Sequence, residues 1–120
     1  MIRTTVATQD IIGNPVTNDQ GENLGEIREI MIDAEYQHVK YVVLSFGGIF
    51  GLGEKFFAIP MSLLEFNLQD KSIILNLPKE VLKTAPGFNK NSWPETTSPY
   101  WHDLVPNFYE PYNASSKADA

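Results

Sequence analysis

Short apolar runs, separated by turns rich in glycine and asparagine, fill the first two thirds of the chain. They predict five strands, at residues 24–33, 39–46, 56–60, 66–68 and 73–77. The turns between them, such as NDQGENLG at residues 18–25, carry the residue types that adopt tight or left-handed conformations. Short strands at this spacing predict a mainly β fold, either a small barrel or a sandwich.

The first of these strands departs from strict alternation. Ile27, Ile30 and Ile32 do not share one parity, so they cannot all face the same side of a regular strand. We therefore expect a β-bulge near Arg28 and Glu29, where one extra residue would restore the alternation.

The strands at 39–46 and 56–60 are apolar on both faces. Both parities of VKYVVLSF carry large apolar side chains, and FFAIP repeats the pattern. A strand with one face in water is apolar on the other face only. A small barrel fills its own interior but cannot shield its exterior, so another part of the chain or a second subunit must cover these strands.

An aromatic segment at residues 88–112, here called the strap, is the expected cover. Seven of the fourteen aromatic residues lie in it. Pro78 opens a helix of one or two turns that ends at Pro86, and Ser98 can cap another short helix further on. The candidate strap contacts are Trp93, Tyr100, Trp101, Phe108 and Tyr109. They either pack as core against the barrel or form an aromatic ligand pocket or partner surface.

These patterns divide the chain into three parts. Residues 1–78 are expected to form a barrel domain, and residues 79–112 a helical and aromatic extension packed on it. Residues 113–120 are expected to be a frayed tail, because terminal residues without apolar anchors seldom stay ordered.

Composition excludes several classes of protein. The net charge is −6 and only nine lysines and arginines are spread along the chain, which argues against nucleic-acid binding. There is no cysteine, so disulfides, thiolate metal sites and cysteine nucleophiles are excluded, and a cytoplasmic location is expected. No apolar run approaches the roughly 18 residues that span a bilayer, so we expect no membrane insertion.

The glycine-rich segment FGGIFGLGEKFFAIP, residues 46–60, does not fit a phosphate-binding loop. Glu54 stands before Lys55, and Phe56 occupies the place where a magnesium-binding hydroxyl is needed. The segment is therefore a connection between strands. It carries three apolar side chains that either tuck under the fold or form an interface with a partner: Ile49, Phe50 and Leu52.

No constellation of residues indicates catalysis, a cofactor or a metal. His38 and His102 have no ligand-spaced neighbours. No nucleophile elbow or comparable signature occurs, so we expect a protein that is not an enzyme.

The segment at residues 11–64 resembles a PRC-barrel domain. The matching positions are Gly13, Val16, Gly21, Leu24, Gly25, Ile27, Asp33, Val39, residues 41–48, Gly53, Glu54, Lys55, Ala58, Ile59 and Pro60. The resemblance covers roughly residues 8–78, and the segments APGFNKNSWPETTSPYW and FYEPY resemble the tail of stand-alone bacterial and archaeal members. That family is similar to the cytoplasmic region of the photosynthetic reaction-centre H subunit and to the C-terminal domain of a ribosome maturation factor. The resemblance implies a six-stranded β-barrel that acts as an adaptor, often by self-association, with no shared catalytic residues.

Two functions are open from the sequence. The first is a protein-interaction module that self-associates, with a dimer favoured because closed symmetric dimers commonly bury an apolar patch. The alternative is a small-ligand or metal-binding protein with its pocket between barrel and strap.

Overall fold

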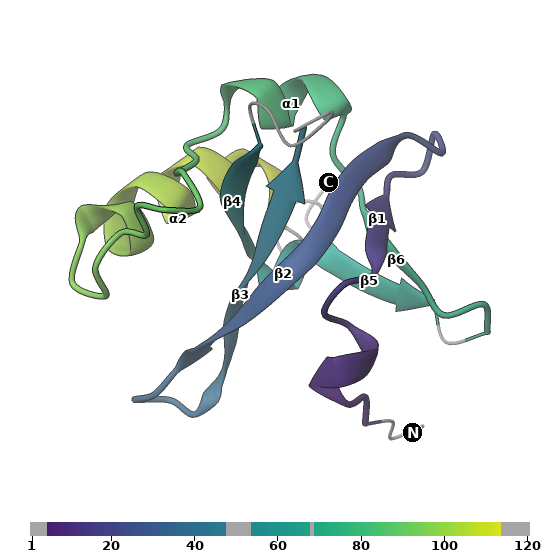
Figure 1. Ribbon diagram of the computed structural model, residues 1–120, viewed down its shortest axis with the longest axis horizontal. Helices are drawn as coiled ribbons and strands as arrows, with labels where there is room; N and C mark the ends of the chain where they lie inside the picture. The colour runs from purple at the N-terminus through teal and green to yellow at the C-terminus, as the bar shows by residue number, and fades with distance from the viewer. Residues whose placement is uncertain (1–4, 48–53, 68, 114–120) are drawn as a thin grey trace.

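The computed structural model describes residues 5–47, 54–67 and 69–113. Six strands form one sheet in the order β4-β3-β2-β1-β6-β5, which curls into a half-barrel (Figure 1). The strands are β1 (Pro15–Thr17), β2 (Asn23–Asp33), β3 (His38–Phe46), β4 (Lys55–Pro60), β5 (Leu64–Asn67) and β6 (Ser72–Leu75). Neighbours are antiparallel except β1 and β6, which run parallel. The expected mainly β, six-stranded fold is confirmed, with β4 and β5 as its two edges.

The strand boundaries differ from the predicted ones mainly in the second half of the sheet. β5 begins at Leu64, directly after the 3-10 turn η3 (Met61–Leu63). β6 ends at Leu75 because the N–H of Leu77 donates to the carbonyl of Leu75, which closes a tight turn. β1 has only three residues and one buried side chain, too few for an alternation pattern to reveal it.

β2 contains the expected bulge and a second one. Its register with β3 shifts between Ile27 and Glu29, as predicted, and again between Met31 and Ile32. The two shifts place the isoleucines in three environments: Ile27 is fully buried, Ile30 is half-buried, and Ile32 is 67% exposed. The second bulge therefore turns an apolar side chain outward near the end of the strand.

Gly25 allows β2 to lie close against β3. Its φ is +114°, and a Cβ added there would lie 1.9 Å from the carbonyl oxygen of Ser45. Any other residue would clash with the backbone of β3, so glycine is required at this position.

The C-terminal third lies along the β4 edge of the sheet (Figure 1). Helix α1 (Lys79–Thr84) is followed by an extended stretch that pairs with β4 at Phe88. The strap continues as a π-helical turn η4 (Tyr100–Leu104), the short helix α2 (Val105–Tyr109) and a 3-10 turn η5 (Glu110–Tyr112). A 3-10 turn, η1 (Thr8–Asp10), precedes β1.

Both faces of β3 and β4 are buried within one chain. On one face, Tyr41 and Phe56 contact the strap rings of Trp101 and Phe88, with centroids 5.9 Å apart in each pair. The opposite face looks across the curled sheet, and its side chains are almost fully buried: Val42, Leu44, Phe57 and Ile59. A second subunit is therefore not needed to cover these two strands.

Candidate functional site

The strap residues singled out from the sequence are docked to different degrees. Tyr100, Trp101 and Tyr109 are buried, and Phe108 is half-buried. Trp93 is 40% exposed, although its ring still meets Phe56 edge-on at 5.8 Å. The three apolar loop residues Ile49, Phe50 and Leu52 lie outside the described residues.

The first half of the strap closes the free edge of β4 with directed hydrogen bonds. Phe56 and Phe88 exchange backbone hydrogen bonds of 2.9 and 2.8 Å. The hydroxyl of Tyr100 accepts the N–H of Ala58 at 3.1 Å and donates to the carbonyl of Pro86 at 3.0 Å. Edge strands with free backbone groups pair readily with other chains, so this half of the strap protects β4.

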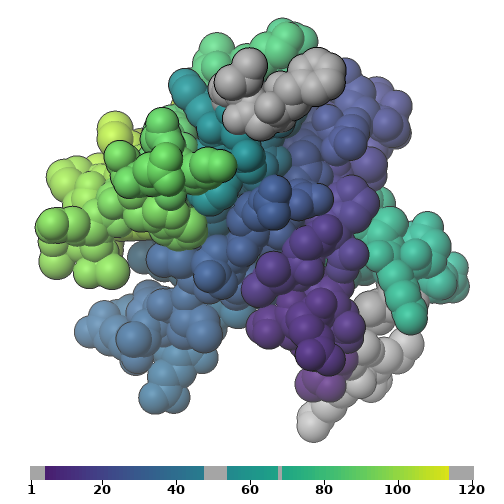
Figure 2. Space-filling view, in the orientation of Figure 1, coloured from purple at the N-terminus to yellow at the C-terminus, as the bar shows by residue number. Residues whose placement is uncertain are grey.

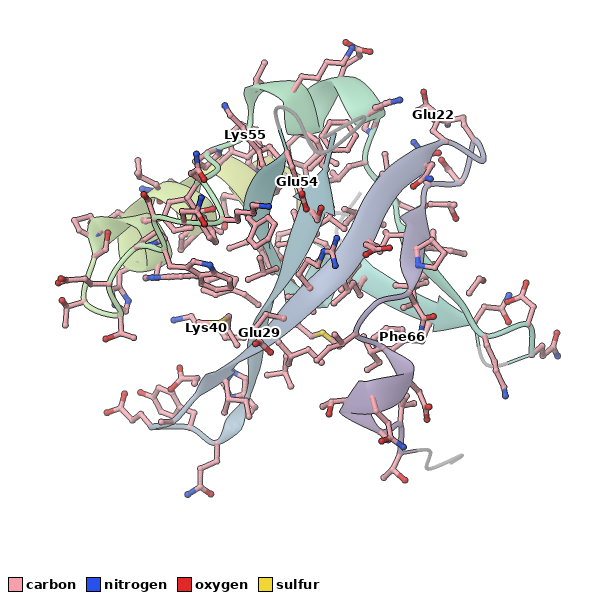
Figure 3. The ribbon with its side chains drawn as sticks, viewed as in Figure 1. Glu22, Glu29, Lys40, Glu54, Lys55 and Phe66 are labelled. Atoms are coloured by element: carbon pink, nitrogen blue, oxygen red, sulfur yellow. The ribbon has the colours of Figure 1, made fainter. Side chains whose placement is uncertain are left out.

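A groove separates the strap from the tip of the β2–β3 hairpin (Figure 2). Its first part is a hollow of about 440 Å³ with the hairpin on one side and Trp101 and His102 on the other. Two hairpin side chains at this hollow are strongly exposed, Ile32 at 67% and Tyr36 at 71%. Lys40 extends from β3 toward the strap and lines the hollow as well (Figure 3).

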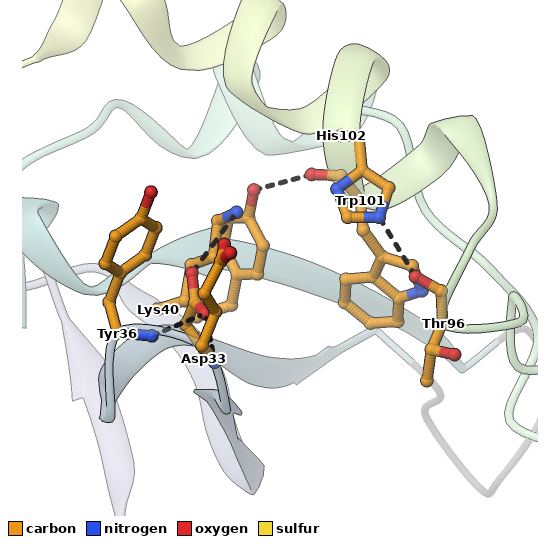
Figure 4. A network of polar contacts seen from close by, with 8 residues as sticks. Asp33, Tyr36, Lys40, Thr96, Trp101 and His102 are labelled. Atoms are coloured by element: carbon orange, nitrogen blue, oxygen red, sulfur yellow. Dashed lines mark hydrogen bonds and ion pairs between the residues drawn. The ribbon is translucent and has the colours of Figure 1, made fainter.

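Asp33 holds the hairpin tip in shape and carries a full negative charge at neutral pH. Its carboxylate accepts the backbone N–H groups of Tyr36 at 3.2 Å and Glu35 at 2.9 Å (Figure 4). The bond from Tyr36, followed by that from Glu35 and the charge of Lys40, holds the pKa of the Asp33 carboxyl below its usual value. The Lys40 ammonium lies 4.0 Å from the carboxylate and 5.6 Å from the centre of the Tyr41 ring.

The second part of the groove is a hollow of about 320 Å³ on the other side of Lys40 and Tyr41. It is bounded by Leu63 of η3 and by Pro106 and Tyr109 of α2. Tyr109 is 1% exposed, and its hydroxyl has no hydrogen-bond partner among the residues that the structure describes. Burial raises the pKa of this phenol far above its usual value, so it stays protonated and can donate.

Two other buried donors at the groove wall are already engaged. Tyr41 donates to the carbonyl of Trp101 at 2.6 Å, which ties β3 to the strap (Figure 4). The indole N–H of Trp101 donates to the carbonyl of Pro94 at 3.2 Å. The Tyr109 hydroxyl is therefore the unusual one among these groups, because a buried polar group without a partner costs stability.

The two histidines have separate surroundings. The Nε2 atom of His102 lies 3.0 Å from the carbonyl oxygen of Thr96, and His38 lies beside the ring of Tyr36 on the hairpin. Within residues 5–47, 54–67 and 69–113, no group of three His, Cys, Asp or Glu side chains could hold a metal ion. In the same part of the chain, no helix has the length and apolar character to cross a bilayer.

The fold defines a small half-barrel of mixed β-sheet whose outer face is closed by a C-terminal strap. The family model of the PRC-barrel domain matches residues 3–82, and the chain belongs to the PRC-barrel family. No curated protein matches the chain. The matched segment ends before the strap begins, so the groove has one wall from the family domain and one wall from outside the match.

Sequence reasoning missed the hairpin wall of the groove. Tyr36 and Lys40 flank a turn and are far from the strap in sequence, and Ile32 entered only the argument for a bulge. The broken parity of the isoleucines in β2 was the available signal, since it implies that one of them points away from the core.

Proposed function

We propose that this chain is a protein-interaction module without catalytic activity, working in the cytoplasm. The observation that carries the proposal is the hairpin tip, where Ile32 and Tyr36 are 67% and 71% exposed beside a groove. Exposed apolar side chains gathered at a hollow commonly mark interaction sites.

The buried titratable groups support a binding role rather than catalysis. Burial raises the pKa of the Tyr100 phenol to about 12, and it also raises the pKa values of the Tyr41 and Tyr109 phenols. At neutral pH these groups are hydrogen-bond donors and not bases. A cytoplasmic location is supported by the absence of cysteine from the sequence.

Self-association through the hairpin tip is part of the proposal. A symmetric dimer places the same patch of both copies in contact, so Ile32 and Tyr36 of each copy would be buried against the other copy. We expect a dimer in solution at micromolar concentration, and a monomer when Ile32→Ser and Tyr36→Ser are combined. Light scattering measures both masses.

The matched control is Ile12→Ser. Ile12 is 39% exposed and lies outside the lining of the groove, so this variant should keep the mass of the unmodified chain. A monomeric unmodified chain would remove self-association from the proposal. A dimer that survives the double substitution would place the interface elsewhere.

A small ligand in the groove is the second candidate, favoured by the 440 Å³ hollow beside the Trp101 ring. Binding there should change tryptophan emission, because Trp101 lines the hollow and a ligand would change the surroundings of its indole. A flat response of Trp93 and Trp101 fluorescence across a screen of metabolites and divalent cations would count against it.

A further inference from the structure

A further hollow, separate from the groove, lies at one end of the half-barrel, between η1 and the β5–β6 hairpin (Figure 1). Its volume is about 560 Å³, which exceeds that of either part of the groove. Both of its walls lie within residues 3–82, the segment that the family model matches. Ligand sites commonly have this size, and the mouths of β-barrels are among their usual places. The half-barrel itself therefore offers a site for a small molecule.

The floor of this hollow is apolar. Phe66 and Ile73 lie opposite each other on β5 and β6, so their side chains share one face of the sheet (Figure 3). This face belongs to the core, because Val16, the partner of Ile73 on β1, is fully buried. Ile11 and Ile73 are buried as well, whereas Phe66 is half-buried. The floor is thus a part of the core that the described residues leave partly uncovered.

Two charged side chains of opposite sign line the two walls. Asp10 belongs to η1, and Lys71 belongs to the turn between β5 and β6. Both are exposed, and neither takes part in an ion pair within the described residues. Among those residues no other charged side chain lines the hollow, so its lining is neutral in a chain with a net charge of −6. Such a lining is complementary to a molecule that carries one charge of each sign.

The backbone fixes the positions of both charged residues. On one wall, the side-chain amide of Asn14 donates to the backbone carbonyl of Asp10, and the N–H of Gly13 donates to the carbonyl of Ile27 on β2 at 2.7 Å. On the other wall, Lys71 has a φ of 60°, in the left-handed region. Glycine and asparagine adopt this conformation more readily than lysine. The turn alone therefore does not account for a lysine at this position, whereas an anionic group of a ligand would.

We propose that this hollow binds a small zwitterionic molecule with an apolar body, the chemical class of apolar amino acids and dipeptides. The ammonium group of the ligand pairs with the carboxylate of Asp10, and its carboxylate pairs with the ammonium group of Lys71. Its apolar side chains cover Phe66 and Ile73. This site is separate from the groove, so it does not rest on the proposed function.

The probe is the dipeptide leucyl-phenylalanine, which combines both charges with two large apolar side chains. Three matched dipeptides each lack one feature: the N-acetylated form has no ammonium group, the C-terminal amide has no carboxylate, and glycyl-glycine has no apolar side chain. In an NMR titration, leucyl-phenylalanine should give saturable shifts centred on the signals of Ile11 and Ile73. Each matched dipeptide should bind more weakly by about threefold or more, the loss expected for one exposed contact.

Two variants assign each charge of the ligand to its wall. Asp10→Asn should weaken leucyl-phenylalanine about three- to tenfold and leave the N-acetylated form unaffected, because that form has no ammonium group to pair. Lys71→Asn should weaken leucyl-phenylalanine by about the same factor and leave the C-terminal amide unaffected. Asparagine suits the φ of Lys71, and the Asp10 side chain makes no hydrogen bond within the described residues, so both variants should keep the fold.

The control variants are Asp19→Asn and Lys90→Asn, which remove the same charges at exposed positions outside the lining of the hollow. Both should keep the affinity of the unmodified chain. The inference is overturned if leucyl-phenylalanine gives no saturable shifts, or if its shifts centre on the groove. Equal binding of all four dipeptides would also overturn it, because neither charge nor apolar surface would then select the ligand. A loss in Asp10→Asn that extends to the N-acetylated form would contradict the pairing of Asp10 with an ammonium group.

Discussion

The two halves of the strap use different forces to hold to the same sheet. Residues 88–101 make backbone and side-chain hydrogen bonds to β4 and surround Phe88 with the rings of Phe56, Trp93, Tyr100 and Trp101. Residues 105–112 dock by burying Val105 and Tyr109 completely, but the Tyr109 hydroxyl makes no hydrogen bond.

The two halves of the strap therefore differ in how firmly their position on the sheet is fixed. Directed hydrogen bonds fix one relative position of two segments, because both distance and angle must be satisfied. Apolar packing holds the second half, and the buried hydroxyl of Tyr109 takes no part in it. We infer that the first half of the strap is a structural clasp, which holds the strap on β4, and that the second half forms one wall of the groove.

The two halves should differ most in how much free energy of unfolding is lost when one aromatic ring is replaced by alanine. Phe88 is 9% exposed at the centre of the aromatic cluster, so Phe88→Ala should lower the free energy of unfolding by about 3–5 kcal/mol. Phe108 is half-buried and, among the rings of the described residues, meets only Tyr109 and Tyr112, so Phe108→Ala should cost about 1–2 kcal/mol. Denaturation in urea measures both. Equal losses would erase the distinction between clasp and wall.

A smaller effect is expected from the hydroxyl that closes the β4 edge. Tyr100→Phe removes the acceptor of the Ala58 N–H and the donor to Pro86, leaving a buried backbone N–H without a partner. We expect a loss of about 1–3 kcal/mol. No loss would mean that the strap does not need this bond to stay on β4.

The same variant has a pH signature. The pKa of the Tyr100 phenol is raised to about 12 in the folded protein, from about 10 in the unfolded chain. Between these values only the unfolded chain has released the proton, so the stability that this group contributes is complete below pH 10 and is lost as the pH rises to 12. Unfolding followed by circular dichroism should therefore depend less steeply on pH in Tyr100→Phe than in the unmodified chain. A parallel pH dependence of both proteins would contradict the assignment.

The smallest effect is expected at Tyr109, where the same substitution removes a hydroxyl that has no partner. Tyr109→Phe should change the free energy of unfolding by less than about 0.5 kcal/mol, or stabilise the protein by up to about 1 kcal/mol. Thermal denaturation beside Tyr100→Phe gives the direct comparison. A loss as large as that of Tyr100→Phe would show that the hydroxyl is satisfied in the folded protein.

Much of the fold could be predicted from the sequence because it depends on local pattern. Short apolar runs bounded by turns predicted β2, β3 and β4 to within one residue at each end, and broken parity predicted the bulge after Ile27. β1 could not be predicted in this way because its pairing with β6, between Val16 and Ile73, joins residues far apart in the chain. The second bulge, after Met31, left no clear pattern because it lies close to the turn.

The sequence by itself determined a cysteine-free, acidic, mainly β chain with an aromatic segment, since charge, residue type and alternation are properties of the chain order. The tertiary structure alone decided that Lys40, Tyr41 and Tyr109 meet at one groove. The end of β4 at Pro60 leaves the edge of β3 open, and the path of the strap then sets the opposite wall of the groove. Both features depend on where strands stop and how a distant segment returns, and no local pattern encodes either of them.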